Sequence, residues 1–444
     1  MFHKLILHKI LSILRPIALG IIYLSCYINL PILTSFILII YSKKLTNIKY
    51  NLKSRKKIIY FYKSIGYDDL ISTFNASPSN HEIFSLERSF LVKVFVFFVG
   101  NKVEDFNYLI KGTGKQKFKY KIFVKNVFLY MKLYWRLGGF ITSTVNPKAD
   151  HGMADASKEL NLPFIVLHKE GIKTEKGRLV QQWIFKNRVG RFKGTKLIVY
   201  NKRERKAFLE SGFVKKSEIT VTGCPRFDWF LKLKKTHPNK KNIVFFLIQS
   251  GNSSYGMPYF NGKWFVPKIL KKKIQVEKSN WDNVNFEYIK FIKKFIQTNK
   301  AYNIIIKTKV GFSSEQLKYL NNFNKKNIKI VKGGSSFSLI KNSEIIVAFN
   351  STVVLEALAA NRLLVSPIDL VHSKKLHNFI LKIKKNYLPI ADLDKLHNKN
   401  IKIKDLKKNN KNELNEIFNR YLGNSDGKAS FRVAKCINDH FKKY

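Results

Sequence analysis

Cysteine is scarce in this chain. Only three cysteines occur among 444 residues, Cys26, Cys224 and Cys436, and they lie far apart with no CxxC pair. A zinc site of four cysteines is therefore excluded, and the count does not favour a disulfide scaffold. A reducing compartment is the natural setting for such a chain.

Acidic residues are also few. Asp and Glu number 29 against 82 Lys and Arg, which gives a formal net charge of +53. A folded surface with this charge attracts polyanions, and anionic lipid headgroups and nucleotide phosphates are both candidates. The chain lacks zinc-finger spacing, an RNP-type signature and a recognition-helix pattern, so specific nucleic-acid binding is not indicated. Asp68-Asp69 is a tempting metal pair, but nothing around it marks a metal site, and we expect no essential metal.

A long uncharged run stands near the N-terminus. Pro16 to Ser42 contains no charged residue across 27 positions, more than the ~20 that span a bilayer as a helix. The run is too long for a simple signal peptide, and Pro31 interrupts it, so a kinked span and a re-entrant helical hairpin are both open. Lysine and arginine flank both ends of this run and are more numerous after it. This asymmetry predicts that the main body of the protein lies on the cytoplasmic side. A monotopic anchor or a buried globular helix pair are the alternatives, and we predict membrane association.

The rest of the chain alternates between apolar runs and helical patterns. A hydrophobic share of 45% indicates a folded protein, and the length suggests two or three domains. Strands are predicted at 58–62, 140–144, 163–167, 197–200, 219–221, 243–248, 304–306, 328–331 and 345–349. Helices are predicted at 120–137, 152–160, 175–187, 202–211, 284–298, 313–323, 336–340, 353–360 and 431–441, while 91–99 fits either state. This rhythm predicts an α/β fold with two doubly wound, Rossmann-like halves.

The expected domain plan follows from this alternation. A hydrophobic segment with a basic flank covers 1–56, an N-terminal Rossmann-like domain 57–230, a lysine-rich linker 231–242, a C-terminal Rossmann-like domain 243–425 and a final helix 426–444. Ligands of such sheets bind beyond the carboxyl ends of the strands, so the loops after Leu167, Val221 and Phe349 are the expected functional regions.

The stretch 343–367 is the clearest unit of the second half. It predicts a buried strand, a polar turn of Asn350, Ser351 and Thr352, and a helix from 353 to 360. All three turn residues are good helix caps, so free N–H groups and hydroxyls at the helix start would suit an anion such as phosphate. Glu356 lies one turn into this helix. An ordinary strand–helix–strand unit is the alternative interpretation.

Three motifs together resemble a known family. They are 221–228 (VTGCPRFD), 349–357 (FNSTVVLEA) and 426–432 (DGKASFR). They are similar to GT-B-type transferases of bacterial surface-carbohydrate synthesis, including capsule glycosyltransferases and CDP-glycerol glycerophosphotransferases, over roughly 140–440. The resemblance implies two Rossmann-like domains facing a cleft, with a nucleotide-activated donor on the C-terminal half.

The resemblance implies roles for the donor residues. Asn350–Thr352 would hold the donor phosphates, and Glu356 would approach the ribose or the transferred group. Lys307 matches a family position where Lys-x-His is common, but Lys309 replaces the histidine here. Two lysines at a strand end can neutralise a diphosphate leaving group, although solvated surface lysines are the alternative. Leu364 stands where many retaining enzymes of this fold carry a second glutamate, which argues against that subclass.

The N-terminal half would supply the acceptor site and a general base. Glu170 and His168 follow a strand, and Asp150-His151 is a second candidate pair at a strand's carboxyl end. Loop histidines without function are the alternative at both places. Four further motif residues complete the candidates, with Arg226 and Asp228 expected to fix geometry and Ser430 and Arg432 expected to contact a phosphate.

The sequence thus predicts a membrane-associated glycosyltransferase, or polyol-phosphate transferase, at the cytoplasmic face of the bacterial inner membrane. Its partners would be a nucleotide-activated donor, a glycan or lipid-linked acceptor and the membrane, with no cofactor. A nucleotide-sugar epimerase of the same architecture is one alternative. A non-catalytic basic protein that binds membrane or nucleic acid is the other.

Overall fold

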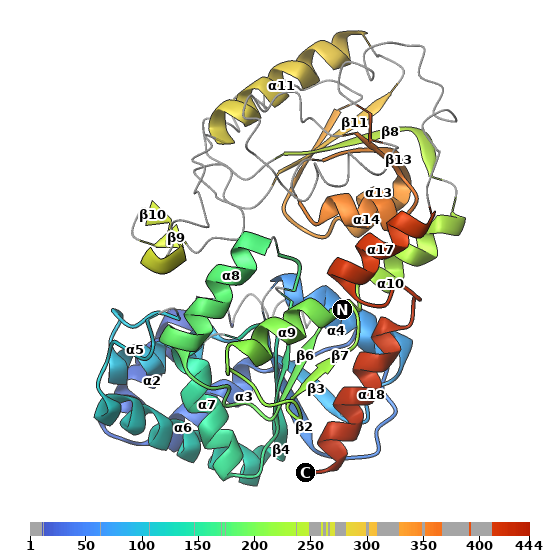
Figure 1. Ribbon diagram of the computed structural model, residues 1–444. Helices are drawn as coiled ribbons and strands as arrows, with labels where there is room; N and C mark the ends of the chain where they lie inside the picture. Colours follow the sequence, from blue (N-terminus) through green and yellow to red (C-terminus); the bar gives the residue numbers. More distant parts are fainter. Residues whose placement is uncertain are drawn as a thin grey trace. The chain divides into compact units, whose positions relative to one another are not determined.

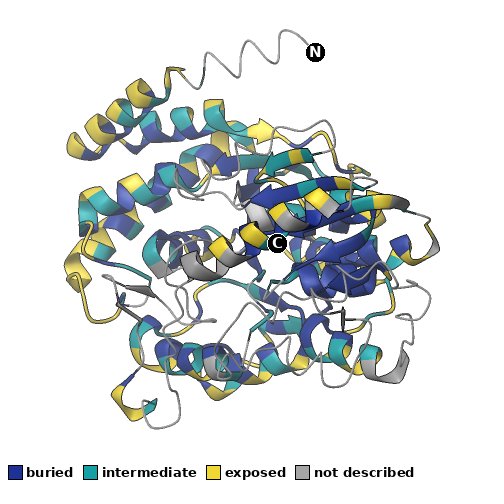
Figure 2. Ribbon diagram, turned by 90° about the horizontal axis from the view of Figure 1, so that it is seen from above, coloured by how far each residue is buried: buried dark blue, intermediate teal, exposed yellow. Residues whose placement is uncertain are grey.

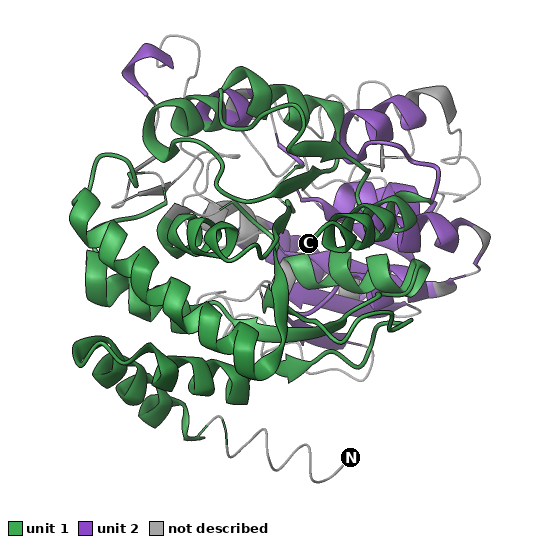
Figure 3. Ribbon diagram, turned by 90° about the horizontal axis from the view of Figure 1, so that it is seen from below, with its two compact units in different colours: residues 1–171, 181–226, 428–444 green, residues 172–180, 227–427 purple. Residues whose placement is uncertain are grey.

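The chain forms two compact units in the computed structural model (Figures 1 and 3). Unit 1 comprises 1–171, 181–226 and 428–444, and unit 2 comprises 172–180 and 227–427. The structure describes residues 11, 13–62, 64–105, 107–145, 147–169, 171–173, 175–236, 238–247, 259–260, 263–264, 267–270, 281–298, 302–308, 328–348, 351–365, 390–391 and 411–444.

Unit 1 is built on a seven-stranded sheet of order β1-β3-β2-β4-β5-β6-β7. Its strands are β1 (Lys43–Lys44), β2 (Lys57–Tyr62), β3 (Glu82–Glu87), β4 (Leu137–Thr142), β5 (Phe164–Leu167), β6 (Lys196–Val199) and β7 (Ile219–Val221). Every pair is parallel except β1 with β3. Strands β4 and β5 are buried along their whole length, as the continuous apolar runs of a sheet covered on both faces require.

Helices connect and cover these strands. They are α4 (Ser64–Ala76), α5 (Ser89–Val99), α6 (Gly114–Trp135), α7 (Pro147–Glu159), a π-helical turn (Phe185–Val189), α9 (Lys202–Glu210) and α18 (Ala429–Lys442). Helix α8 (Glu175–Ile184) is divided between the units, because its residues up to Val180 belong to unit 2. Phe128 of α6 packs on Phe140 of β4 with ring centroids 4.4 Å apart, and Phe140 in turn stacks on Phe61 of β2. Stacked aromatic rings of this kind form the centre of the unit 1 core.

The uncharged N-terminal run folds into two short helices rather than one continuous helix. Helix α2 (Arg15–Tyr27) has 13 residues and α3 (Pro31–Tyr41) has 11, and the chain turns between them where Asn29 takes a φ of 52°. Thr34 of α3 donates to the Ser25 hydroxyl of α2 at 2.9 Å. Helix α2 packs on α5 and α3 packs on α6. No helix among the described residues is both long and apolar enough to cross a membrane.

Unit 2 is built on a six-stranded, fully parallel sheet of order β12-β11-β8-β13-β14-β15. Its strands are β8 (Asn239–Phe246), β11 (Asn303–Thr308), β12 (Ile328–Lys332), β13 (Ser343–Val347), β14 (Leu363–Val365) and β15 (Ile390–Ala391), beside a small hairpin of β9 (Tyr259–Phe260) and β10 (Lys263–Trp264). Its helices are α10 (Phe227–Lys232), α11 (Trp281–Thr298), α13 (Phe337–Asn342), α14 (Val353–Ala359) and α17 (Lys411–Leu422), with 3-10 turns at Leu233–Lys235 and Lys268–Leu270. Apolar side chains of β8, β11, β13 and β14 and one face of α11 form a continuous core.

These elements confirm the mixed α/β fold with parallel sheets. The stretch 91–99 is helical as α5, whereas β3 and α4 were not predicted. Within 231–242, expected as a linker, the structure has the end of α10, a 3-10 turn and the start of β8. The last helix belongs to unit 1, because Ser430 donates to the carbonyl oxygen of Pro225 at 3.0 Å. The expected helix 313–323 lies outside the described residues.

Candidate functional site

The carboxyl edge of the unit 2 sheet gathers most of the predicted donor residues. Lys307 lies near the end of β11, Gly333-Gly334 follows β12, and Ser351 and Thr352 follow β13. Strands β12, β11, β8 and β13 are neighbours in that order and all run parallel, so these residues lie along one edge of the sheet. This is the edge where doubly wound sheets bind ligands.

Glu356 is the central acidic group of this edge. It lies in the first turn of α14 and is only 5% exposed. Its carboxylate accepts hydrogen bonds from the Ser336 hydroxyl, just before α13, and from the Thr352 hydroxyl, the latter at 3.4 Å. Two hydroxyls thus donate to one buried carboxylate, and the vicinal hydroxyls of a sugar are donors of the same kind.

The predicted capping of α14 is only partly correct. Ser351 Oγ accepts from the backbone N–H of Val353 at 3.4 Å, but the Thr352 side chain makes no capping bond. Thr352 instead donates its hydroxyl hydrogen to the Glu356 carboxylate, one turn further along. A hydrogen bond to an ionised carboxylate is stronger than one between a neutral N–H and a neutral hydroxyl. Asn350 lies outside the described residues.

Lys307 is the basic group of the same edge. Its Nζ donates to the carbonyl oxygen of Gly333, and burial lowers its pKa. Gly333 and Gly334 take φ values of 61° and 80°, which glycine adopts without strain. The tight turn thus brings a backbone carbonyl to a desolvated ammonium. An anionic ligand would compensate this desolvation better than a carbonyl does. Lys309 lies outside the described residues.

In unit 1, His168 pairs with an acidic residue that the sequence did not reveal. His168 follows β5, and its ring packs edge-on against Phe208 with centroids 5.3 Å apart. Its Nε2 lies 4.0 Å from Oε2 of Glu204, and both side chains are buried. Asn201 fixes Glu204 by accepting from its backbone N–H at 2.9 Å at the start of α9. Glu170 lies outside the described residues.

Asp150 is bound in an ion pair. Arg88 Nε lies 2.6 Å from Asp150 Oδ1, and the Arg88 guanidinium also donates to the carbonyl oxygen of Lys148. Between them, Ala149 takes a φ of 67°, a strained value for a residue with a Cβ. An aspartate whose charge is neutralised by a buried arginine is a weak general base, so its contacts favour a structural role.

His151 is buried beside Asp150. Its ring packs against Tyr108 with centroids 4.9 Å apart, and burial lowers its pKa to about 3, helped by Lys193 and Lys117. Its Nε2 is buried without a hydrogen-bond partner among the described residues. The imidazole is therefore neutral at physiological pH, and its burial favours a core position over a contact with an acceptor.

The family-like motif residues of unit 1 form a buried polar cluster. Arg226 Nη1 lies 3.1 Å from Asp69 Oδ2, and the Tyr200 hydroxyl donates to the same carboxylate. Ser430 Oγ bonds the carbonyl oxygen of Pro225, and Arg432 Nε donates to the carbonyl oxygen of Thr222 at 2.7 Å. These contacts tie α18 to the segment after β7.

The contacts of this cluster bear on the earlier interpretations of Asp69, Ser430 and Arg432. Asp69 is engaged by Arg226 and Tyr200, and no group of three His, Cys, Asp or Glu residues in the described part of the chain is arranged to hold a metal ion. Ser430 and Arg432 bond backbone carbonyls, where a phosphate contact was expected. Asp228 is buried in the first turn of α10.

Several residues of these clusters were missed by sequence reasoning. They are Arg88, Glu204 and Ser336, while Asp69 was considered only as part of a metal pair. Ser336 had a detectable signal, because it ends a Gly-Gly-Ser-Ser run directly after a strand. The others had none, since their partners are distant in sequence.

Comparisons with known proteins find similar solved structures. A UDP-GlcNAc 2-epimerase from Methanocaldococcus jannaschii is 14% identical with a TM-score of 0.44, covering 87% of this chain and 100% of that one. A UDP-GlcNAc 2-epimerase from Neisseria meningitidis bound to UDP-GlcNAc is 10% identical with a TM-score of 0.43, covering 86% and 100%. A variant of the wall teichoic acid polymerase TagF is 13% identical with a TM-score of 0.45, covering 90% and 92%. No protein-family model and no curated protein matches the chain.

Proposed function

We propose that this protein is a membrane-associated GT-B-type transferase. It moves a sugar, or a polyol phosphate, from a nucleotide-activated donor to a surface polysaccharide or lipid-linked acceptor at the cytoplasmic face of the bacterial inner membrane. The observation that carries the proposal is the buried Glu356 carboxylate, held by two hydroxyls on the same sheet edge as Lys307.

Glu356 and Lys307 supply complementary halves of a nucleotide site. A carboxylate has about four acceptor sites, so the vicinal hydroxyls of a ribose can donate to Glu356 alongside those of Ser336 and Thr352, which orient it. Lys307 can exchange the carbonyl of Gly333 for a phosphate oxygen and neutralise a diphosphate leaving group. These residues stabilise the departing charge without a metal or cofactor, and we propose none.

We assign the acceptor side to unit 1 and the general base to His168. Glu204 lies near its Nε2, and a neighbouring carboxylate stabilises the imidazolium that forms when the base takes the acceptor hydroxyl proton. The contacts of Asp150 and His151 argue for structural roles. Glu170 remains a candidate base on sequence grounds.

The proposed membrane contact rests on an exposed apolar surface of unit 1, here called the apolar face. On α6 it is formed by the exposed residues Phe118, Ile122, Leu129 and Leu133. The last three follow Phe118 by about one, three and four helical turns, so all four lie in one stripe along the helix. The buried residues of α6, such as Phe123 and Val127, occupy the opposite side.

The two N-terminal helices extend this surface. Their exposed apolar residues include Ile17, Leu24, Tyr27, Phe36 and Ile40. Figure 2 shows exposed stretches, in yellow, along the helices that follow the N-terminus. Exposed lysines occur on α5, on α6 and in the segment between them, at 93, 102, 111, 115 and 119. Apolar side chains bordered by lysines suit the boundary between acyl chains and anionic headgroups, and such a helix lies in the interface without spanning it.

The proposed donor site is tested by a thermal-shift screen of nucleotide sugars and CDP-polyols. A ligand at 100 times its dissociation constant stabilises the folded state by about 2.7 kcal/mol, so its effect is readily measured. We expect at least one pyrimidine nucleotide donor to stabilise the protein, and Ser336→Ala to weaken that effect. Ser335→Ala is the matched control, because Ser335 is exposed and bonds only a backbone N–H among the described contacts.

Turnover of the stabilising donor then separates the reaction classes. Release of the nucleotide only when an acceptor is present supports the transferase. Conversion of the donor sugar with no acceptor would contradict the transferase and indicate an epimerase. Absence of a stabilising nucleotide would contradict the donor site itself.

A further inference from the structure

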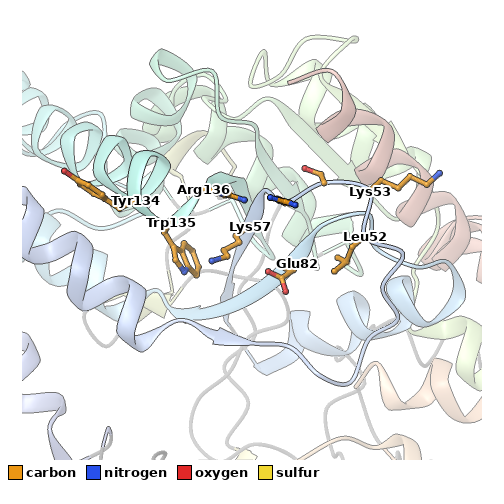
Figure 4. Close-up of a pocket in the computed structure, with 9 residues that line it drawn as sticks. Leu52, Lys53, Lys57, Glu82, Tyr134, Trp135 and Arg136 are labelled. Carbon is orange, nitrogen blue, oxygen red and sulfur yellow. The ribbon is translucent and has the colours of Figure 1, made fainter.

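A basic pocket lies in unit 1 at the amino end of the sheet. It has a volume of about 610 Å3 and is bounded by the start of β2, the start of β3 and the end of α6 (Figure 4). It is lined by Leu52, Lys53, Ser54, Arg55, Lys57, Glu82, Tyr134, Trp135 and Arg136. The strands carrying the acceptor candidates end at the opposite edge, so this pocket plays no part in the site described above.

The pocket carries a net positive charge. Lys53, Arg55, Lys57 and Arg136 line it, and Glu82 is the acidic residue among its lining. Glu82 already pairs with Lys44, whereas none of the four cations forms an ion pair with a carboxylate in the described part of the chain. The carboxyl end of α6 contributes only about half a negative charge, which is too little to balance them.

The chain is so rich in lysine that a basic patch could arise by composition alone, but two features of this pocket are specific. Lys57 Nζ lies 5.0 Å from the ring centroid of Trp135 and 5.8 Å from that of Phe84, so aromatic faces hold the ammonium in place. In Figure 4 the Lys57 side chain lies between Trp135 and Glu82. A solvated surface lysine does not need such ring contacts, so Lys57 is held at the pocket more firmly than an ordinary surface lysine.

Arg136 is the second specific feature. It ends α6 in the left-handed conformation, with φ 59° and ψ 41°, at a position where glycine or asparagine is preferred. An arginine there is less favourable than glycine, because its Cβ lies too close to the following carbonyl oxygen. The sequence thus keeps a guanidinium at the pocket at the expense of stability, a pattern typical of functional positions.

The pocket is continuous with the apolar face. Tyr134 lines the pocket and is 64% exposed, and its ring stacks on Phe36 of α3 with centroids 6.3 Å apart. Leu133, at the end of the α6 stripe, precedes it, and the pocket's far side carries the exposed Leu52. A cluster of cations therefore lies directly beside apolar side chains that face solvent.

We propose that this pocket binds the phosphate of an anionic phospholipid headgroup while the apolar face enters the bilayer surface. The inference rests on the membrane association in the proposed function and adds a defined headgroup site to it. A soluble phosphate would need the cations alone. A lipid phosphate explains both the cations and the exposed apolar rim, because the acyl chains of the same lipid would contact the exposed side chains of Tyr134 and Leu133.

The test measures binding of the full chain to vesicles by sedimentation. Vesicles of phosphatidylcholine alone are compared with vesicles that contain about 30% phosphatidylglycerol, both at about 0.1 M salt. We expect Lys53→Gln/Arg136→Gly to lower the partition coefficient on phosphatidylglycerol vesicles about 30-fold, since each basic residue near an anionic surface contributes about fivefold. Lys202→Gln/Lys216→Gln is the control, because it removes the same charge from exposed sites of unit 1 away from the pocket.

The outcomes separate this proposal from the function it rests on. Wild-type protein that binds neither kind of vesicle would overturn the membrane association and the headgroup site together. Equal losses in the pocket and control variants would overturn the headgroup site alone and leave a diffuse charge effect. Pocket variants that lose calorimetric binding of inorganic phosphate but bind phosphatidylglycerol vesicles as wild type does would show a site for a free anion and would also overturn the proposal.

Discussion

Mild acid should destabilise unit 1, in part through the buried His151. The pKa of buried His151 is lowered to about 3, whereas a histidine in the unfolded chain has a pKa of about 6.5. Between these values the unfolded state binds a proton that the folded state does not, so the free energy of unfolding falls as pH falls. Linkage gives a loss of about 2 kcal/mol at pH 5 against about 0.2 kcal/mol at pH 7.

The loss at pH 5 depends little on the exact folded-state pKa. At that pH the unfolded histidine is almost fully protonated and the folded one almost fully neutral, and this remains so for a pKa of 4. The measured quantity should be the difference between the free energies of unfolding at pH 7 and pH 5, since constant effects of a substitution then cancel.

The assay is urea unfolding of wild type, His151→Leu and Met153→Leu at both pH values. His151→Leu should reduce the difference between pH 7 and pH 5 by about 2 kcal/mol, because leucine does not titrate. Met153 is buried on the same helix without a titrating group, so Met153→Leu should leave the difference at its wild-type value. The same pH difference in wild type and His151→Leu would refute the burial argument.

Three further predictions concern stability and the donor site. Arg226→Ala should lower the free energy of unfolding by about 3–5 kcal/mol, because it leaves the Asp69 carboxylate buried without its guanidinium, and a loss below about 1 kcal/mol in urea unfolding would contradict the ion pair's role. Arg136→Gly should raise the free energy of unfolding of unit 1 by about 1 kcal/mol, because it removes the steric cost of a left-handed arginine, and calorimetry showing a destabilised variant would contradict this. Ser336→Ala should weaken nucleotide binding about tenfold, since it removes one hydroxyl that orients Glu356, and an unchanged dissociation constant would count against that orientation.

Much of the fold follows from local sequence patterns. Runs such as Phe164–Leu167 and Ile345–Val347 are apolar and β-branched, and they alternate with helical periodicity, which is enough to predict parallel sheets. Strand β3 was missed because Glu82–Glu87 has charged ends and only partial burial. It lies beside β2 near the sheet edge, where burial does not require a continuous apolar run.

The candidate site was predictable only in part. Glu356 and Lys307 could be placed because each follows or ends a predicted strand. The pairing of Asp69 with Arg226 joins residues 157 positions apart, and that of Arg88 with Asp150 joins residues 62 apart, so neither leaves a local pattern. The Thr352 cap failed for a local reason, since the Thr352 hydroxyl bonds the Glu356 carboxylate one turn further along and not a backbone N–H.

Calorimetric titration of CDP and UDP into wild type, Glu356→Gln and Lys307→Met tests the nucleotide site most directly. Both substitutions keep the side-chain length while removing the charge, and each should raise the dissociation constant about 10- to 100-fold, the cost of a lost hydrogen bond to a charged group. Circular dichroism of the variants controls for folding. Wild-type binding of one nucleotide with both variants strongly weakened is the predicted result, and equal affinity in folded variants would contradict the assignment of this sheet edge as the donor site.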